Sequence, residues 1–143
     1  MVEEIVHNDK LLAIIIKSSF AKEGIEFFTP SHFSQQLGYM KRLKGYKVEA
    51  HSHKIVERKV FLTQEVLVIK SGKIEVRIFE NDENFIALRI LTSGDIILMA
   101  QGGHSIEMLE DTEIIEVKQG PYTENDKIKI TEKKYDECSK QAF

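Results

Sequence analysis

The stretch Lys73-Ile74-Glu75-Val76-Arg77-Ile78 decides the fold class of this chain, because apolar and charged side chains alternate along it. Successive side chains on a β-strand point to opposite faces, so the three apolar residues share one face and the three charged residues share the other. Alternation of this kind indicates a strand with one face in a core and the other in solvent.

Similar segments rich in Ile, Val, Phe and Tyr recur on both sides of this stretch, separated by turn signals such as Ser71-Gly72 and Ser93-Gly94. The strands expected from them cover residues 11–20, 35–43, 46–53, 59–70, 73–80, 85–92, 95–100, 104–109 and 113–118. No long helical pattern competes, although residues 31–37 are compatible with one short helical turn. Many short strands predict an all-β sandwich or barrel.

Length and composition predict one domain followed by a polar segment. The 143 residues are enough for a core without disulfides or a structural metal, and no linker or internal repeat divides them. From Gly120-Pro121 onward Thr, Glu, Asn, Asp and Lys dominate. We therefore expect a β-domain over residues 1–120 and an edge or tail segment over residues 121–143.

Charge and cysteine content narrow the classes of partner. The net charge of −3 argues against nucleic acid as the main partner. The single Cys138 rules out an internal disulfide framework and suits a reducing compartment, and we interpret it as a spectator on a polar tail. No apolar run reaches the ~18–20 residues of a membrane helix. The expectation is a cytoplasmic protein with no nucleic-acid or membrane partner.

Three of the five histidines lie at positions that favour a metal site. His51 and His53 are one residue apart, so on the expected strand 46–53 they point to the same side. The glycine-rich stretch 94–104 ends on a third histidine, His104. Two imidazoles from one strand, with a third histidine and a carboxylate from other strands, are the ligands of a mononuclear metal site.

The spacing around the histidine pair resembles the first motif of the cupin superfamily of small β-barrels. That motif reads Gly, five residues, His-x-His, three or four residues, Glu, six residues, Gly. Five residues separate Gly45 from His51-Ser-His53, and six residues separate Glu65 from Gly72. The departure is the step between His53 and Glu65, which has eleven residues.

The second half of the resemblance is the stretch 94–104. The second cupin motif reads Gly, five residues, Pro-x-Gly, two residues, His. Here Gly94, Ala100-Gln-Gly102 and His104 follow that order, with Ala in place of Pro and one residue missing. The resemblance implies a jelly-roll barrel, also called a double-stranded β-helix, with its motifs at 45–72 and 94–104.

By this resemblance His51, His53, Glu65 and His104 are the ligands of one divalent ion, and Fe, Mn, Ni, Co and Zn are not distinguished. Glu57 competes for the carboxylate position because it lies four residues after His53. The six-residue step to Gly72 favours Glu65. Either set leaves coordination positions open, which is what polarisation of a substrate oxygen requires.

The function expected from the resemblance is isomerisation or epimerisation of a polar carbonyl or sugar-like substrate, with Glu57, Glu65 or a water held by the ion moving a proton. A non-catalytic ligand-binding or sensor protein and an Fe(II) dioxygenase are the alternatives. In a barrel that has lost its metal, His51 or His53 is the expected general base and Tyr39 or Tyr46 the acid.

Three further residues are candidates for the substrate pocket. Arg58 lies on the insertion between the histidine pair and Glu65, where its guanidinium can bind an anionic group. Gln36 and Met108 lie on expected strands that border the barrel interior. The resemblance also implies a homodimer, for which the apolar segment 11–16 is a candidate contact.

Overall fold

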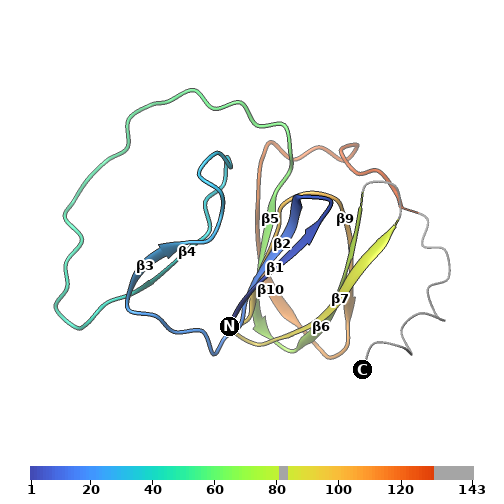
Figure 1. The fold of residues 1–143 in the computed structure, drawn as a ribbon, viewed down its shortest axis with the longest axis horizontal. Helices are drawn as coiled ribbons and strands as arrows, with labels where there is room; N and C mark the ends of the chain where they lie inside the picture. Colours follow the sequence, from blue (N-terminus) through green and yellow to red (C-terminus); the bar gives the residue numbers. More distant parts are fainter. Residues whose placement is uncertain (81–83, 131–143) are drawn as a thin grey trace.

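The computed structural model describes residues 1–80 and 84–130, which form antiparallel sheets and contain no helix (Figure 1). Because these residues contain no helix, none of them makes a helix long and apolar enough to cross a membrane. The strands are β1 (Val2–His7), β2 (Lys10–Ile16), β3 (Gly24–Phe27), β4 (Gly38–Lys41), β5 (Glu65–Ser71), β6 (Lys73–Phe79), β7 (Phe85–Thr92), β8 (Ile96–Met99), β9 (Gly103–Met108) and β10 (Glu113–Lys118). The all-β class predicted from the sequence is confirmed.

Two sheets of unequal width build the body of the protein. One has five strands in the order β1-β2-β8-β5-β10, and the other has three in the order β7-β6-β9. The hairpin β3–β4 forms a separate two-stranded sheet. Among the described residues the strand pairings leave both larger sheets open, so they do not close into one barrel.

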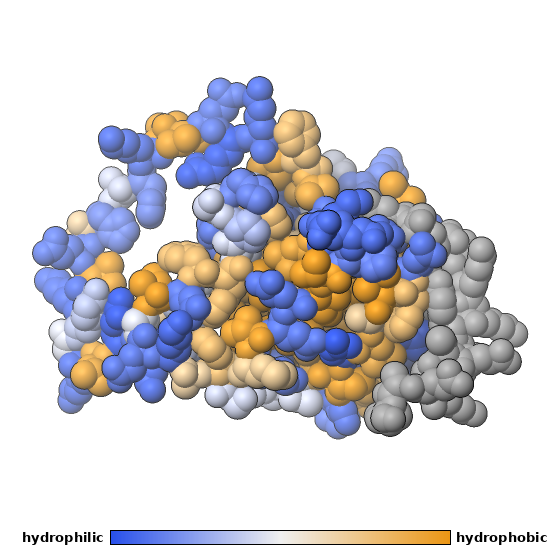
Figure 2. All heavy atoms as spheres, in the orientation of Figure 1, coloured by the Kyte–Doolittle hydropathy of each residue, from blue (hydrophilic) through white to orange (hydrophobic). Residues whose placement is uncertain are grey.

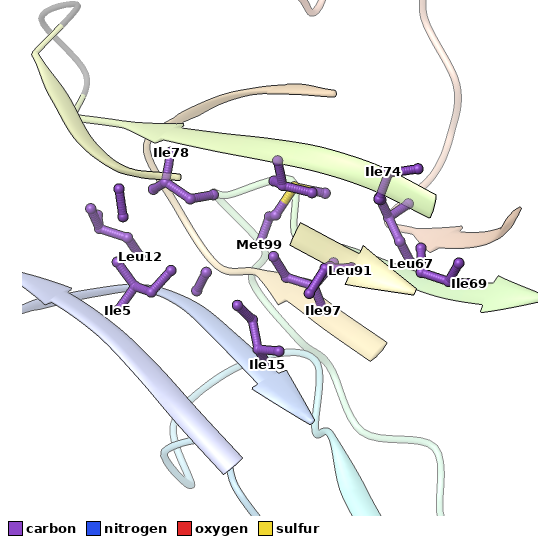
Figure 3. Packing of buried hydrophobic residues seen from close by; sticks show 13 residues of the cluster. Ile5, Leu12, Ile15, Leu67, Ile69, Ile74, Ile78, Leu91, Ile97 and Met99 are labelled. Carbon is purple, nitrogen blue, oxygen red and sulfur yellow. The ribbon is translucent and has the colours of Figure 1, made fainter. Parts of the chain in front are cut away.

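The core lies between the two larger sheets (Figure 3). Ile74, Val76 and Ile78 of β6 are almost completely buried in it, which confirms the alternation in the sequence. From the five-stranded sheet the core receives Leu67 and Ile69 of β5 and other inward-pointing residues.

The five-stranded sheet also buries its outer face. Ile14, Val66 and Leu98 form a second apolar cluster there, against which Phe28 and Leu37 pack. Coverage on both faces explains why the segment 11–16 reads as a continuous apolar run rather than an alternation. Residues 12–16 are buried in the middle of the sheet, so this segment does not offer the dimer contact that the sequence suggested.

The two sheets are joined on one side and separated on the other. At the joined side Arg89 of β7 donates to the Glu3 carboxylate of β1 at 2.6 Å, and His7 lies 3.4 Å from Glu80. At the opposite side β9 and β10 are the edge strands of their sheets, and the described residues show no pairing between them. Because five strands face three, the inner face of β5 and β10 remains partly uncovered.

The observed strands agree with the strands predicted from the sequence in the second half of the chain and differ from them in the first half. The expected strands at 73–80, 85–92, 95–100, 104–109 and 113–118 are confirmed within one residue. The expected strand 46–53 is wrong, and that of 59–70 begins only at Glu65, because residues 42–64 have no strand. Strands β1 and β3 were not expected, and residues 31–37 form turns. Within the predicted tail, Cys138 and its neighbours from 131 onward lie outside the described residues.

Asp95 fastens the end of β2 to the turn before β8. Its fully buried carboxylate accepts hydrogen bonds from the backbone N–H groups of Ser18 (2.8 Å) and Thr92 (2.9 Å) and from Lys17 Nζ (2.5 Å). Burial alone would raise the pKa of Asp95, but these three donors outweigh it and hold the pKa below the ordinary value of 3.8.

We predict that Asp95→Ala lowers the free energy of unfolding by about 3 kcal/mol, because it leaves a partly buried ammonium and two N–H groups without their acceptor. Since the folded pKa is depressed, the contribution of Asp95 is present above the ordinary value of 3.8 and is lost as pH falls through the folded pKa. Urea denaturation at several pH values measures both effects. Glu113→Gln, which breaks an exposed pair with Lys70, is the control and changes stability by less than about 1 kcal/mol.

Candidate functional site

A cavity of about 800 Å³ lies at the side where the two sheets separate. Its walls come from the inner faces of β5 and β10, from β9 across the gap, and from residues 126–130. The cavity follows from the unequal widths of the sheets, because the three-stranded sheet ends before it covers the last two strands of the other. Its volume is in the range of small-molecule sites.

The lining is apolar at the core side and polar toward the opening. Side chains shared with the hydrophobic core or packed against it form one wall: Leu67, Met99, Ile106 and Ile114. Charged and hydrogen-bonding side chains form the rest: Thr63, Glu65, Gln101, His104, Ser105, Glu116, Lys118, Asp126, Lys127 and Lys129. An apolar wall with a few polar groups is the usual composition of a ligand site.

Glu65 and His104 make the central polar contact of the cavity. Glu65 is the first residue of β5 and His104 the second of β9, so the pair bridges the two sheets across the gap. His104 Nε2 donates to Glu65 Oε2 at 3.0 Å, and the two side chains are 30% and 15% exposed. With Nε2 as the donor, Nδ1 of His104 is left as a hydrogen-bond acceptor.

The carboxyl group of Glu65 is held in its ionised form. The hydrogen bond from His104 lowers the pKa of Glu65 below its ordinary value of 4.5, and the positive charges of Lys118 and Lys127 lower it further, against the opposing effect of burial. A carboxylate at this position fixes the orientation of the imidazole ring.

Lys118 is the third charged group at the centre, and the sequence analysis did not identify it. Its ammonium lies 3.8 Å from Glu65 Oε1 and 3.3 Å from Glu116 Oε1, and the contact with Glu116 raises the pKa of Lys118. Lys118 reaches Glu65 because β10 pairs with β5 in the register that places these two residues opposite each other. The pairing of β10 with β5 cannot be predicted from a local sequence motif. The contact between Lys118 and Glu65 was therefore identified only from the structure of the sheet.

The structure brings three of the predicted site residues to the cavity. Glu65 and His104 are in direct contact, and Met108 lines the wall on the same strand as His104. Glu57, the competing carboxylate, is exposed in the segment before β5 and does not line the cavity. The structure thus favours Glu65 over Glu57 as the partner of His104.

His51 and His53 lie outside the cavity lining. Both are exposed in the strandless segment 42–63, so the strand geometry from which their common direction was inferred is absent. Their rings are 5.2 Å apart, and His51 Nδ1 donates to the carbonyl oxygen of Glu49 at 2.8 Å. The predicted histidine pair therefore exists as neighbours but does not reach Glu65 and His104.

The other candidates also have local roles. Tyr39 packs edge to face on Phe20 with a centroid distance of 5.0 Å. Gln36 donates to the carbonyl oxygens of Pro30 and Phe33 and thereby holds a turn. Arg58 is exposed and donates to the carbonyl oxygen of Val56. These three side chains are not among the residues that line the cavity.

The donors as placed do not fit a metal ion. Glu65 and His104 offer one oxygen and one nitrogen ligand, and the Lys118 ammonium beside Glu65 opposes a second cation. Across residues 1–80 and 84–130 no group of three His, Cys, Asp or Glu side chains is positioned to hold an ion. The metal site implied by the resemblance stays a prediction.

Comparison with known proteins assigns no family. The chain matches no protein-family model, no curated protein and no solved structure. The functional interpretation therefore depends on the cavity and on the residues that line it.

We predict that His104→Gln raises the pKa of Glu65 toward its ordinary value of 4.5, because the largest cause of the depressed pKa is the hydrogen bond from His104. The contribution of Glu65 to stability is present above that ordinary value and is lost as pH falls through the folded pKa. Carboxyl carbon chemical shifts, followed by NMR against pH, measure the change. Lys118→Met is the comparison, and a larger shift there than in His104→Gln would contradict the assignment.

Proposed function

We propose that the protein binds a small polar organic molecule in the cavity between β5, β9 and β10, with Glu65 and His104 as its polar anchors. The observation that carries the proposal is the bridging pair itself. A carboxylate and an imidazole in hydrogen-bond contact, largely shielded from solvent beside an apolar wall, are suited to hold the hydroxyl or carbonyl groups of a ligand.

The charges around the cavity indicate the class of ligand. Three lysines and three carboxylates line it, namely Lys118, Lys127, Lys129, Glu65, Glu116 and Asp126. Because neither sign is in excess, the cavity favours a molecule with several hydrogen-bonding groups over a strongly charged one. A hydroxylated or carbonyl compound with one apolar face matches both the polar rim and the wall formed by Leu67, Ile106 and Ile114.

Proton transfer is the second candidate function, and the orientation of His104 favours it. With Nε2 bonded to the Glu65 carboxylate, Nδ1 of His104 remains available to accept a proton from a bound molecule. An isomerase removes a proton beside a carbonyl group and returns it to the neighbouring carbon on the same face, and His104 can serve as the base and then as the acid for both steps. Epimerisation also needs a proton donor on the opposite face of the substrate, so Glu65 and His104 alone favour the isomerisation expected from the sequence.

A cupin-like jelly roll remains our proposal for the finer class of fold. It is supported by the two glycine and histidine motifs and by the contact between Glu65 of the first motif and His104 of the second. For His51 and His53 to reach Glu65 and His104, the segment 42–63 would have to fold toward the cavity. The twelve-residue step from His53 to Glu65 spans at most about 40 Å when extended, so chain length permits it.

We predict that thermal-shift screening of polyols, sugars and hydroxy or keto acids finds a ligand that raises the melting temperature, because a molecule that binds only the folded state stabilises it. Calorimetry with that ligand then compares the wild type with Glu65→Gln and His104→Gln. Each substitution removes a charged or ring hydrogen-bonding group and is expected to weaken binding by roughly tenfold.

The matched control for this experiment is Glu26→Gln, which makes the same chemical change on β3, on a side chain that is 36% exposed and outside the cavity lining. Unchanged affinity in Glu65→Gln and His104→Gln, with the fold intact by NMR, would refute the proposed site. Conversion of the ligand to an isomer or epimer, lost in His104→Gln, distinguishes an enzyme from a binding protein.

The predicted metal site has its own test. If the segment 42–63 completes it, protein purified without a histidine tag binds about one equivalent of Mn, Ni, Zn or Fe, gains thermal stability, and loses both in His51→Ala and His104→Gln. Elemental analysis and thermal unfolding measure these changes, with Glu57→Gln as the control that keeps the metal. Absence of bound metal and of any stability gain rejects this part of the prediction.

A further inference from the structure

The segment between β4 and β5, residues 42–63, forms a long arm that is exposed along its whole length. In Figure 1 it makes a wide excursion away from the two larger sheets before it enters β5. It ends at Gln64, which is buried and whose backbone N–H donates to the side chain of Gln119. The arm is therefore anchored to the body at its end and presented outward elsewhere.

The arm carries a charge opposite to that of the rest of the chain. It has six basic residues (Arg42, Lys44, Lys47, Lys54, Arg58 and Lys59) and two acidic ones (Glu49 and Glu57), a net charge of +4. The whole chain carries −3, so the other residues carry −7. The small net charge of the whole chain therefore does not reveal that the arm is basic and the remaining residues are acidic.

Large apolar side chains are interspersed among the basic residues of the arm. Ile55 is fully exposed, Phe61 is 89% exposed and Leu43 is 76% exposed, and Val48, Val56 and Leu62 are each at least half exposed. Figure 2 shows blue and orange side chains following each other along this part of the chain. So much exposed apolar surface beside like charges is typical of a segment that binds a partner.

A surface with the complementary properties lies on β9, β10 and the turn that joins them. Residues 103–118, which we call the β9–β10 arch, contain five acidic residues (Glu107, Glu110, Asp111, Glu113 and Glu116) and one lysine, a net charge of −4 with His104 neutral. All five acidic residues are exposed. Ile115 and Val117, each about half exposed, add an apolar patch.

Within residues 1–80 and 84–130, the outer edges of β9 and β10 have no strand paired with them. β9 and β10 are edge strands, and alternation along β10 directs Ile114 and Glu116 into the cavity and Glu113, Ile115 and Val117 to the outer face. An extended segment with basic and apolar side chains is suited to lie along such an edge.

We propose that the arm of one copy of this chain docks on the β9–β10 arch of a second copy. Charge and hydrophobicity match on both surfaces, and a two-fold dimer makes the contact twice because each copy has both parts. The net charge of −7 outside the arm opposes approach to nucleic acid or an anionic membrane, whereas the acidic arch of a second copy attracts the arm. The interface adjoins the proposed ligand site, because β9 and β10 also form walls of the cavity.

Sedimentation equilibrium tests the proposal on the full chain, over a range of protein and salt concentrations. We expect a monomer–dimer equilibrium that salt weakens, because screening reduces attraction between exposed charges. The arm variant Lys54→Glu/Lys59→Glu and the arch variant Glu110→Lys/Glu113→Lys are each expected to raise the dimer dissociation constant by roughly tenfold or more. Each variant brings the net charge of its own surface to zero, so the two combined in one chain are expected to leave the dimer weakened as well.

The control is Lys10→Glu/Lys22→Glu, which makes the same charge change on exposed residues outside the arm and leaves the dimer intact. Carbodiimide cross-linking of mixed isotope-labelled and unlabelled protein is expected to join arm lysines of one copy to arch carboxylates of the other. A monomer at every concentration, a dimer insensitive to both charge variants, or arm–arch cross-links confined to single chains would overturn the proposal. Binding of phosphatidylserine vesicles or DNA in place of dimerisation would overturn it as well.

Discussion

The unequal width of the two facing sheets is the constraint on which the rest of the structure depends. Five strands face three, and the ion pair between Glu3 and Arg89 joins the two sheets at the β1–β7 side. The surplus width therefore falls at β5 and β10. There β9 covers the inner face only in part, polar side chains line it beside the core residues, and a cavity forms. The arrangement of strands thus determines where a ligand can enter before any particular site residue is considered.

The sequence predicted the parts of this fold that local pattern determines. The alternation at 73–78 and the turns at Gly72 and Gly94 located the strands of the second half, because side-chain period and turn chemistry are local properties. The pattern failed at residues 46–53, where alternating residues belong to the exposed arm. Alternation shows that a segment can pair as a strand, but the pairing itself depends on a neighbouring strand that the sequence does not reveal.

The site was predictable to a similar extent. Motif spacing selected Glu65 and His104, which are 39 positions apart in the chain and 3.0 Å apart between their side-chain atoms. Lys118 could not be selected in this way, because it reaches Glu65 through the β5–β10 register alone. The whole-chain charge likewise concealed the basic arm and the acidic arch, since opposite charges in different segments cancel in the sum.

Because the cavity lies at the edges of the sheets, the residues that would bind a ligand can change in evolution without changing most of the residues that stabilise the fold. Most residues of the core between the sheets, such as Ile74, Val76 and Ile97, do not line the cavity, which shares Leu67 and Met99 with the core. The polar residues on its rim contribute little to that core. Substitutions at Ser105, Gln101 or Thr63 can therefore alter which molecule is accepted while the scaffold keeps its stability, so related chains can diverge in specificity on one architecture.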